Sequence, residues 1–150
     1  MKLFAVLAAL ALASPLPAGA ADDALDLLTA PSDTYTVLDF AASWCTPCYR
    51  ALPRLQALAR EVPDLRVVVV SVDETERGRD RLVRELDLEL EVVWDGDHAL
   101  ISKLAPEAFP ATYVLDPSGE VVYSHLGYDP KVFDEFAEVV RGLQRSLQSP

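Results

Sequence analysis

The feature that most constrains this chain is a pair of cysteines, Cys45 and Cys48, placed where a strand pattern gives way to a helix pattern. Residues 35–42 (YTVLDFAA) are rich in β-formers and apolar on both faces, which predicts a buried central strand. From Cys45 to about Val62, apolar residues recur at helical spacing. Two cysteines at positions i and i+3 lie on one side of a helix, with the Cα separation of roughly 5.5 Å that a disulfide needs. The junction therefore predicts a strand, a turn and a helix that presents two sulfur atoms together.

Strand and helix patterns alternate along the rest of the chain. The segments expected after the first helix are a strand at 65–72, a charged helix at 75–86 with a solvated face, a strand or loop at 91–94, a helix at 98–104, strands at 113–115 and 121–124, and a helix that Asp129 and Pro130 cap. Crossover helices make the first two strands parallel, whereas a hairpin makes the last two antiparallel. The prediction is an α/β fold with a mixed central β-sheet flanked by helices on both faces.

The last helix carries the longest apolar pattern in the chain. Its spacing of apolar positions is helical, and one stripe is expected to face the core. The residues on that stripe are Val132, Phe133, Phe136, Val140, Leu143 and Leu147.

The N-terminus has the pattern of an export signal. Lys2 is followed by an apolar run at 3–13 and by the small residues Ala18-Gly19-Ala20, after which we expect cleavage. The apolar run is short for a membrane span of about 20 residues, so an uncleaved membrane anchor is the less favoured alternative. No cysteine lies near the cleavage point, so no lipid anchor is expected. The expected division is a signal peptide at 1–20, an N-terminal segment at 21–34 and one domain at 35–150 of an exported protein.

The charge of the chain limits its partners. The sequence holds 13 lysines and arginines against 24 aspartates and glutamates, for a net charge of -11. Binding to nucleic acid or to an anionic membrane needs basic patches, so neither is expected as the main task.

Export changes how the two cysteines are interpreted. In an oxidising compartment a cysteine pair is by default a structural disulfide. A crosslink that closes so short a loop removes little entropy from the unfolded chain, so a redox role is the better interpretation. At a helix N-terminus the N–H groups and the dipole favour the Cys45 thiolate, the nucleophile, and Cys48 would be the resolving thiol. The alternatives are a redox-silent disulfide and a zinc site, which His98 and His125 are too distant in sequence to complete. No metal and no cofactor are expected.

Two further residues carry chemical information. Asp39 lies within an apolar strand, where burial should raise its pKa and let it accept the proton of Cys48. The alternative is a strand-edge aspartate that faces solvent. Pro110 directly precedes a predicted strand, and only about one X-Pro bond in twenty is cis in folded proteins, so the residues alone leave its isomer open.

Together these residues resemble the thioredoxin superfamily, and its exported TlpA/ResA-like thiol-disulfide oxidoreductases in particular. The resemblance runs from Tyr35 to the C-terminal helix and rests on VLDFAASWCTPC, Pro53, FPATYVLDPSGEVV and Gly127. It implies a thioredoxin-like fold in which Pro110 is a cis-proline that faces the cysteines and shapes a substrate groove. The residues that would contact substrate there are Trp44, Thr46, Pro47, Phe109 and Pro110.

Two departures bear on the mechanism. ResA-like proteins carry a glutamate three residues after the second cysteine, where this chain has Ala51, and Asp39 instead matches the buried aspartate of thioredoxin. Proton handling is therefore expected to resemble that of thioredoxin. The bulky Phe109 could restrict which substrates fit.

The resemblance implies a reductase that acts on disulfides in periplasmic proteins and is recycled by a membrane electron donor. Three alternatives stay open at this point. One is an oxidase that donates disulfides, although Thr46-Pro47 lacks the histidine that oxidising relatives carry between their cysteines. The others are a non-catalytic binding module and a metallochaperone.

Overall fold

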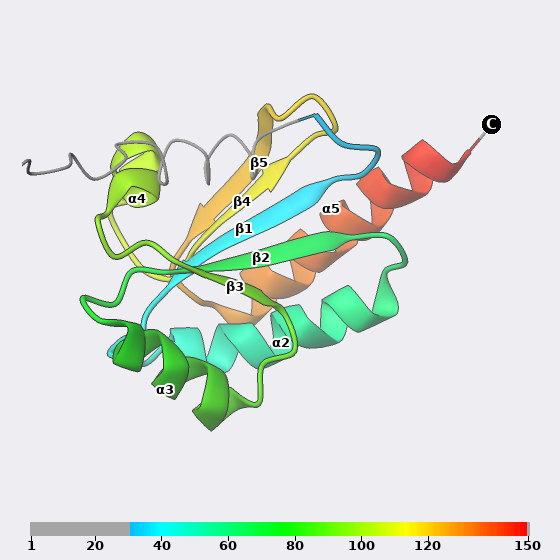
Figure 1. The fold of residues 1–150 in the computed structure, drawn as a ribbon. Helices are drawn as coiled ribbons and strands as arrows, with labels where there is room; N and C mark the ends of the chain where they lie inside the picture. The colour runs from blue at the N-terminus through cyan, green and yellow to red at the C-terminus, as the bar shows by residue number, and fades with distance from the viewer. Residues whose placement is uncertain (1–30, 150) are drawn as a thin grey trace, which may run out of the picture.

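A computed structural model describes residues 31–149 of the chain. The expected signal peptide and most of the expected N-terminal segment lie outside these residues. The elements in chain order are β1 (Thr36–Ala41), α2 (Cys48–Glu61), β2 (Arg66–Ser71), α3 (Glu76–Leu86), β3 (Glu91–Trp94), α4 (Ala99–Leu104), β4 (Ala111–Leu115), β5 (Val121–Leu126) and α5 (Pro130–Gln148) (Figure 1). Within the described part of the chain, no helix is both long enough and apolar enough to cross a membrane.

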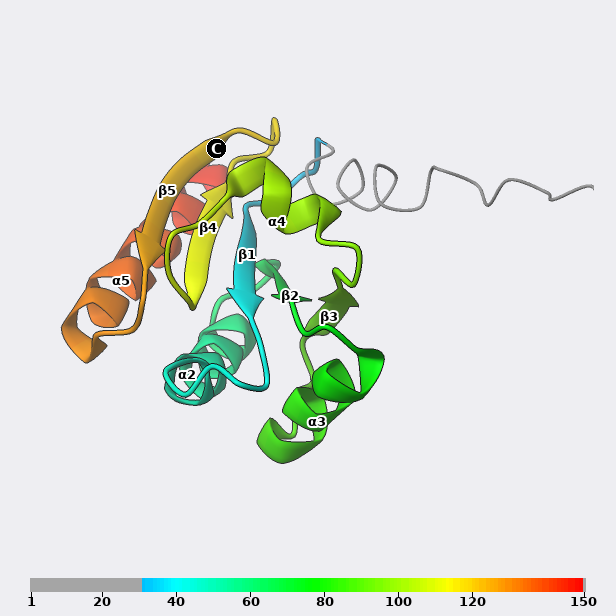
Figure 2. The same ribbon diagram turned by 90° about the vertical axis from the view of Figure 1, so that its left-hand side faces the viewer.

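The strands form one mixed sheet in the order β3-β2-β1-β4-β5. β1 pairs in parallel with β2, and β2 with β3, whereas β1–β4 and β4–β5 are antiparallel. Figure 2 shows α2 and α3 on one side of the sheet and α4 on the other. The predicted α/β fold with helices on both faces is confirmed, and the segment at 91–94, left open between strand and loop, is a strand.

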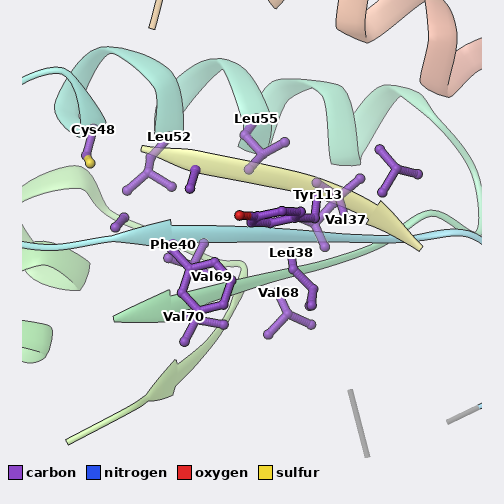
Figure 3. Packing of buried hydrophobic residues seen from close by; sticks show 14 of the residues in the cluster. Val37, Leu38, Phe40, Cys48, Leu52, Leu55, Val68, Val69, Val70 and Tyr113 are labelled. Carbon is purple, nitrogen blue, oxygen red and sulfur yellow. The ribbon is translucent and has the colours of Figure 1, made fainter. Parts of the chain in front are cut away.

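The core lies between the sheet and the helices, and β1 is buried along its whole length. Figure 3 shows Cys48, Leu52 and Leu55 of α2 directed toward the strands. The neighbouring strands supply the rest of the cluster, mostly valines and other aliphatic residues together with Phe40 and Tyr113. β1 and β2 are apolar on both faces because both faces of the sheet are covered.

Helix α5 covers the same face of the sheet as α2. The Arg54 guanidinium of α2 lies 4.5 Å from the centroid of the Phe133 ring and forms an ion pair with Asp134, both residues of α5. At the C-terminal end of α2, Arg141 of α5 forms an ion pair with Glu61 at 2.8 Å. The helix that begins at Cys48 therefore contacts α5 at its middle and at its C-terminal end.

The stripe predicted for α5 is partly wrong. Phe133, Phe136 and Val140 are buried as expected, but Val132 is 37% exposed and Leu147 is 40% exposed. Gln144 occupies the buried position instead, and its side-chain amide donates to the carbonyl oxygen of Pro63 at 3.3 Å. Steps of three and four residues from Phe133 lead to Phe136, Val140 and Gln144, so the helical period brings a polar residue into the core-facing row.

Candidate active site

The cysteine pair lies at the junction of β1 and α2, as the sequence predicts. Cys45 and Cys48 form a disulfide with a Cα–Cα distance of 5.3 Å. The prediction that the helix begins at Cys45 is wrong by three residues, because α2 begins at Cys48 with Pro47 as its N-cap. Cys48 N donates to the Cys45 carbonyl oxygen at 3.1 Å, and the first i→i+4 bond runs from Ala51 N to Pro47 O. Cys45 therefore lies in a tight turn just before the helix.

The sulfur atom of Cys45 receives a hydrogen bond from the start of α2. The backbone N–H of Cys48 donates to Cys45 Sγ at 3.3 Å. Here Sγ is half of a disulfide, and it stands in for the thiolate of the reduced protein. An N–H at a helix N-terminus stabilises negative charge at that position, which lowers the pKa of a thiol. Cys45 is 4% exposed and Cys48 is fully buried, so Cys45 is the more accessible of the two sulfur-bearing residues.

Asp39 is buried in the middle of the sheet. β1 lies between β2 and β4, and the Asp39 side chain is 1% exposed, so the strand-edge alternative is wrong. Its Oδ1 accepts a hydrogen bond from Thr112 Oγ1 at 2.6 Å, and its buried Oδ2 has no partner among the described residues. Burial raises the pKa of Asp39 to about 7, an effect that the Thr112 hydrogen bond partly offsets. A carboxyl group with this pKa can both hold and release a proton near neutral pH.

Asp39 lies on the face of the sheet that α2 and α5 cover. Strand register places Asp39 opposite Thr112, and Thr112 opposite His125, so the three side chains share one face of the sheet. The His125 ring packs against Phe136 of α5, with ring centroids 5.2 Å apart. Burial lowers the pKa of His125. Asp39 therefore lies beneath α2 and α5, on the side of the sheet where Cys48 is buried.

The segment before β4 lies at the same edge of the sheet as the cysteine turn. The register pairs Phe40 near the end of β1 with Ala111 at the start of β4. The peptide bond between Phe109 and Pro110 is cis, and Pro110 O accepts a hydrogen bond from Gly127 N at 2.7 Å. The rings of Phe109 and Trp44 meet edge to face, with centroids 5.5 Å apart. Trp44 is nonetheless 58% exposed, so it presents an aromatic surface to solvent beside the disulfide.

These elements, in this order and around this cysteine turn, match a known family. A family model described as thioredoxin-like matches residues 33–121, which is more than half of the chain. The chain belongs to the thioredoxin-like family.

Individual relatives of this thioredoxin-like chain match it over part of its length. The thiol-disulfide oxidoreductase ResA of Oceanobacillus iheyensis is 36% identical over 89 residues, which cover 57% of this chain and 45% of that protein. StoA from Bacillus subtilis superposes with a TM-score of 0.62 at 21% identity, over 71% of this chain and 82% of that one. An uncharacterized thioredoxin-like protein from Porphyromonas gingivalis superposes with a TM-score of 0.64 at 27% identity, over 76% and 78%. The chain spans about half the length of the curated relatives it matches.

One member of the site was missed by the sequence analysis. Asp73 follows β2 and is buried, and its carboxylate holds the residue that precedes Trp44. It accepts hydrogen bonds from Ser43 N at 3.0 Å, from Ser43 Oγ at 2.6 Å and from Ser71 Oγ at 2.9 Å. The position of Asp73 directly after β2 could have indicated this role. Adjacent parallel strands end at the same edge of a sheet, and β1, which is parallel to β2, ends at the cysteine turn. Asp73 thus connects β2 to the loop that leads into Cys45 in this thioredoxin-like fold.

A glycine of α3 packs directly against Asp73, so the effect of an alanine there can be compared with that of an alanine at an uncrowded glycine of α5. A Cβ atom at Gly78 would lie 2.5 Å from Asp73 Oδ1, whereas one at Gly142 of α5 would meet nothing within 4 Å. Alanine inside a helix is favoured over glycine by about 1 kcal/mol, but overpacking costs about 1–3 kcal/mol. We expect Gly78→Ala to destabilise the protein by up to about 2 kcal/mol and Gly142→Ala to stabilise it by about 0.5–1 kcal/mol. Urea denaturation of both variants measures the difference, and an equal stabilisation of both would contradict the contact with Asp73.

Proposed function

We propose that this protein is an exported thiol-disulfide oxidoreductase that reduces disulfides in other proteins through Cys45 and Cys48. The observation that carries the proposal is the cysteine turn itself. The sulfur of Cys45 faces an N–H at the start of α2, and the adjacent face of the sheet holds a buried carboxyl group with a pKa of about 7. The membership of the thioredoxin-like family and the names of the ResA relatives support the same chemistry.

The proposed reaction transfers two electrons from the dithiol to a target disulfide. The Cys45 thiolate attacks one sulfur of the target and forms a mixed disulfide, while the other target sulfur leaves and takes up a proton. Cys48 then gives its proton to Asp39, attacks Cys45 Sγ and displaces the second target thiolate, which is protonated. The target ends as a dithiol, and Cys45 and Cys48 end as the disulfide seen in the structure.

The proposed substrate groove lies between the cysteine turn and the Phe109–Pro110 segment. Trp44 and Phe109 contact each other across it, and Thr46 is exposed on the turn. We assign Trp44, Thr46, Pro47, Phe109 and Pro110 to contact with the polypeptide that carries the target disulfide. The edge-to-face pair of Trp44 and Phe109 narrows this groove, so a bulky residue beside the target cysteine is expected to be disfavoured.

Export and recycling belong to the same proposal. The signal pattern at residues 1–20 supports delivery to the periplasm, with residues 35–150 as the functional domain. A periplasmic reductase is oxidised in each cycle, so it needs a supply of electrons from outside the oxidising compartment. A membrane protein that passes electrons from the cytoplasm is the proposed donor.

The reduction potential of the cysteine pair tests the direction of electron flow. The protein is equilibrated with defined dithiothreitol or glutathione buffers, and the fraction of disulfide is measured by mass after thiol alkylation. We expect a value near about -270 mV, as for thioredoxin, which identifies a reductant. A value near about -120 mV would identify a disulfide donor instead. A pair that does not titrate as a two-electron couple would rule out the enzyme.

A further inference from the structure

A hollow beside the cysteine turn is not used by the proposed reaction. Its volume is about 560 Å³, and its lining includes Ser43, Trp44, Arg77, Arg81 and Arg84. Ser43 and Trp44 directly precede Cys45, whereas the three arginines come from α3. The hollow, hereafter the arginine pocket, therefore adjoins the reactive sulfur through Trp44.

The arginine pocket is positively charged in a chain whose net charge is -11. Positions 77, 81 and 84 lie four and three residues apart, so their side chains share one side of α3. Arg81 donates to Ser43 Oγ at 2.8 Å. Within residues 31–149, Arg77 and Arg84 have neither a hydrogen bond nor an ion pair to any other side chain. The arginines that pair with carboxylates in the structure are Arg54, Arg60, Arg66, Arg79 and Arg141.

The lining of the arginine pocket carries a surplus of one positive charge, because its three guanidinium groups face the two carboxylates of Asp73 and Glu74. The Asp73 carboxylate is oriented by hydrogen bonds from Ser43 and Ser71, so it is not paired with an arginine. Glu85 accepts the hydroxyl of Tyr49 at 2.6 Å, and Asp80 pairs with Arg79. Of the carboxylates that line the pocket, Glu74 alone has no bond to a neighbour in the described chain, against three guanidinium groups.

We propose that the arginine pocket binds carboxylate side chains of the target protein, in the segment next to the disulfide that Cys45 attacks. The inference rests on the proposed function and adds a substrate class to it, namely disulfides flanked by acidic residues. A guanidinium group pairs with a carboxylate through two parallel hydrogen bonds, so arginines that lack such a partner form a fitting site for acidic side chains. Trp44 belongs both to the pocket and to the cysteine turn, so a chain docked at Cys45 passes the pocket within a few residues.

Matched peptide disulfides test this substrate class. Three peptides of equal length carry the same disulfide, flanked by acidic, neutral or basic residues, and the second-order rate of their reduction by the reduced protein is measured at low salt. We expect the acidic peptide to react about fivefold faster than the neutral one, as one or two exposed ion pairs would produce. The advantage should disappear in 1 M salt, where charges are screened beyond about 3 Å.

Two sets of variants assign the preference to the pocket. The double variant Arg77→Gln/Arg84→Gln is expected to lose the preference for the acidic peptide and to reduce the neutral peptide at the wild-type rate. Arg145→Gln removes one positive charge, half of what the double variant removes, from an exposed arginine in the last turn of α5, and it is expected to keep the preference. A preference that survives in the double variant, or equal rates for the three peptides, would overturn the inference and leave the proposed function intact.

A binding measurement separates the two proposals. If no peptide is reduced, the proposed function fails, and calorimetric binding of a cysteine-free acidic peptide to the oxidised protein then decides the inference. Binding that the double variant loses supports the pocket, and absence of binding overturns it. Glutarate, a free dicarboxylate, is the second ligand in this experiment. Binding of glutarate as tight as that of the peptide would make the pocket a site for small anions and would also overturn the inference.

Discussion

Replacing Cys48 with serine is expected to arrest the protein as a mixed disulfide with its target, whereas Cys45→Ser is expected to abolish the reaction. Without Cys48, release of the target depends on a thiol from solution instead of one held beside Cys45 Sγ. Intramolecular thiols react with effective concentrations far above those of free thiols, so we expect turnover to fall by at least about 10³-fold. Non-reducing electrophoresis and intact-mass measurement of the trapped complex detect the arrest.

The two cysteine variants control for each other, since each removes one sulfur from the same turn. Both serines keep the size of the side chain nearly unchanged, and the disulfide closes a turn of only three positions, so similar folding stability is expected for both. If Cys45→Ser traps targets and Cys48→Ser does not, the assignment of nucleophile and resolving thiol is reversed. Equal trapping by both would show that burial of Cys48 does not distinguish them.

Replacing Asp39 with asparagine is expected to stabilise the folded protein above pH 7. The variant should also lose most of the change in the free energy of unfolding that the wild type shows between about pH 4 and pH 7. The folded-state pKa of about 7 lies above the ordinary value of 3.8, so the folded protein holds the proton more tightly than the unfolded chain does. The stability that the bound proton contributes to the folded state is complete below about pH 4 and is lost as the pH rises through about 7. The difference between the two pKa values corresponds to about 4 kcal/mol in all.

Denaturant unfolding of the oxidised protein at pH 5 and pH 8 measures this effect. Glu107→Gln provides the control, because Glu107 is exposed and its removal should change neither the stability nor its slope with pH. The asparagine side chain of Asp39→Asn could still accept the hydroxyl of Thr112, which limits the structural change at this position. A wild-type stability that does not vary between the two pH values would contradict the raised pKa of Asp39.

The same variant tests the proposed role of Asp39 in catalysis. Without a carboxylate to accept its proton, Cys48 should resolve the mixed disulfide about 10²-fold more slowly near pH 7, within the usual range for general base catalysis. The loss should shrink as the pH rises, because hydroxide then takes over the removal of the Cys48 proton. A rate that falls by the same factor at every pH would indicate a structural role instead.

The elements were predictable because their local patterns agree with their final environment. β1 is apolar on both faces and lies in the centre of a covered sheet, and Asp129 caps α5 as its sequence suggests. The start of α2 was misplaced because the residues around Pro47 form a tighter turn than the helix that follows. The inner stripe of α5 was misjudged because apolar character alone was counted, whereas the helical period brings the polar Gln144 inward.

The site was predictable only where it is local in sequence. Cys45, Cys48 and Asp39 stand within one strand-turn-helix unit, so pattern and chemistry coincide there. The partner of Asp39, Thr112, is 73 residues away, and strand register alone brings them together. The charged residues of α3 were interpreted as a solvated face, because no sequence pattern shows that Trp44 lies across from three of them. Contacts between residues far apart in sequence depend on the order of the strands and on their register, which the sequence as a whole determines and no short motif reveals.

The order in which the chain can acquire its structure follows from the placement of α5. Phe133, Phe136 and Val140 close the face of the sheet that holds Asp39, and they come from the last element of the described chain. Contacts between segments so distant in sequence form late, since a large loop has to close first. Until they form, the carboxyl of Asp39 remains in water and ionised at neutral pH. Docking of α5 is therefore expected to coincide with partial uptake of a proton by Asp39 at neutral pH.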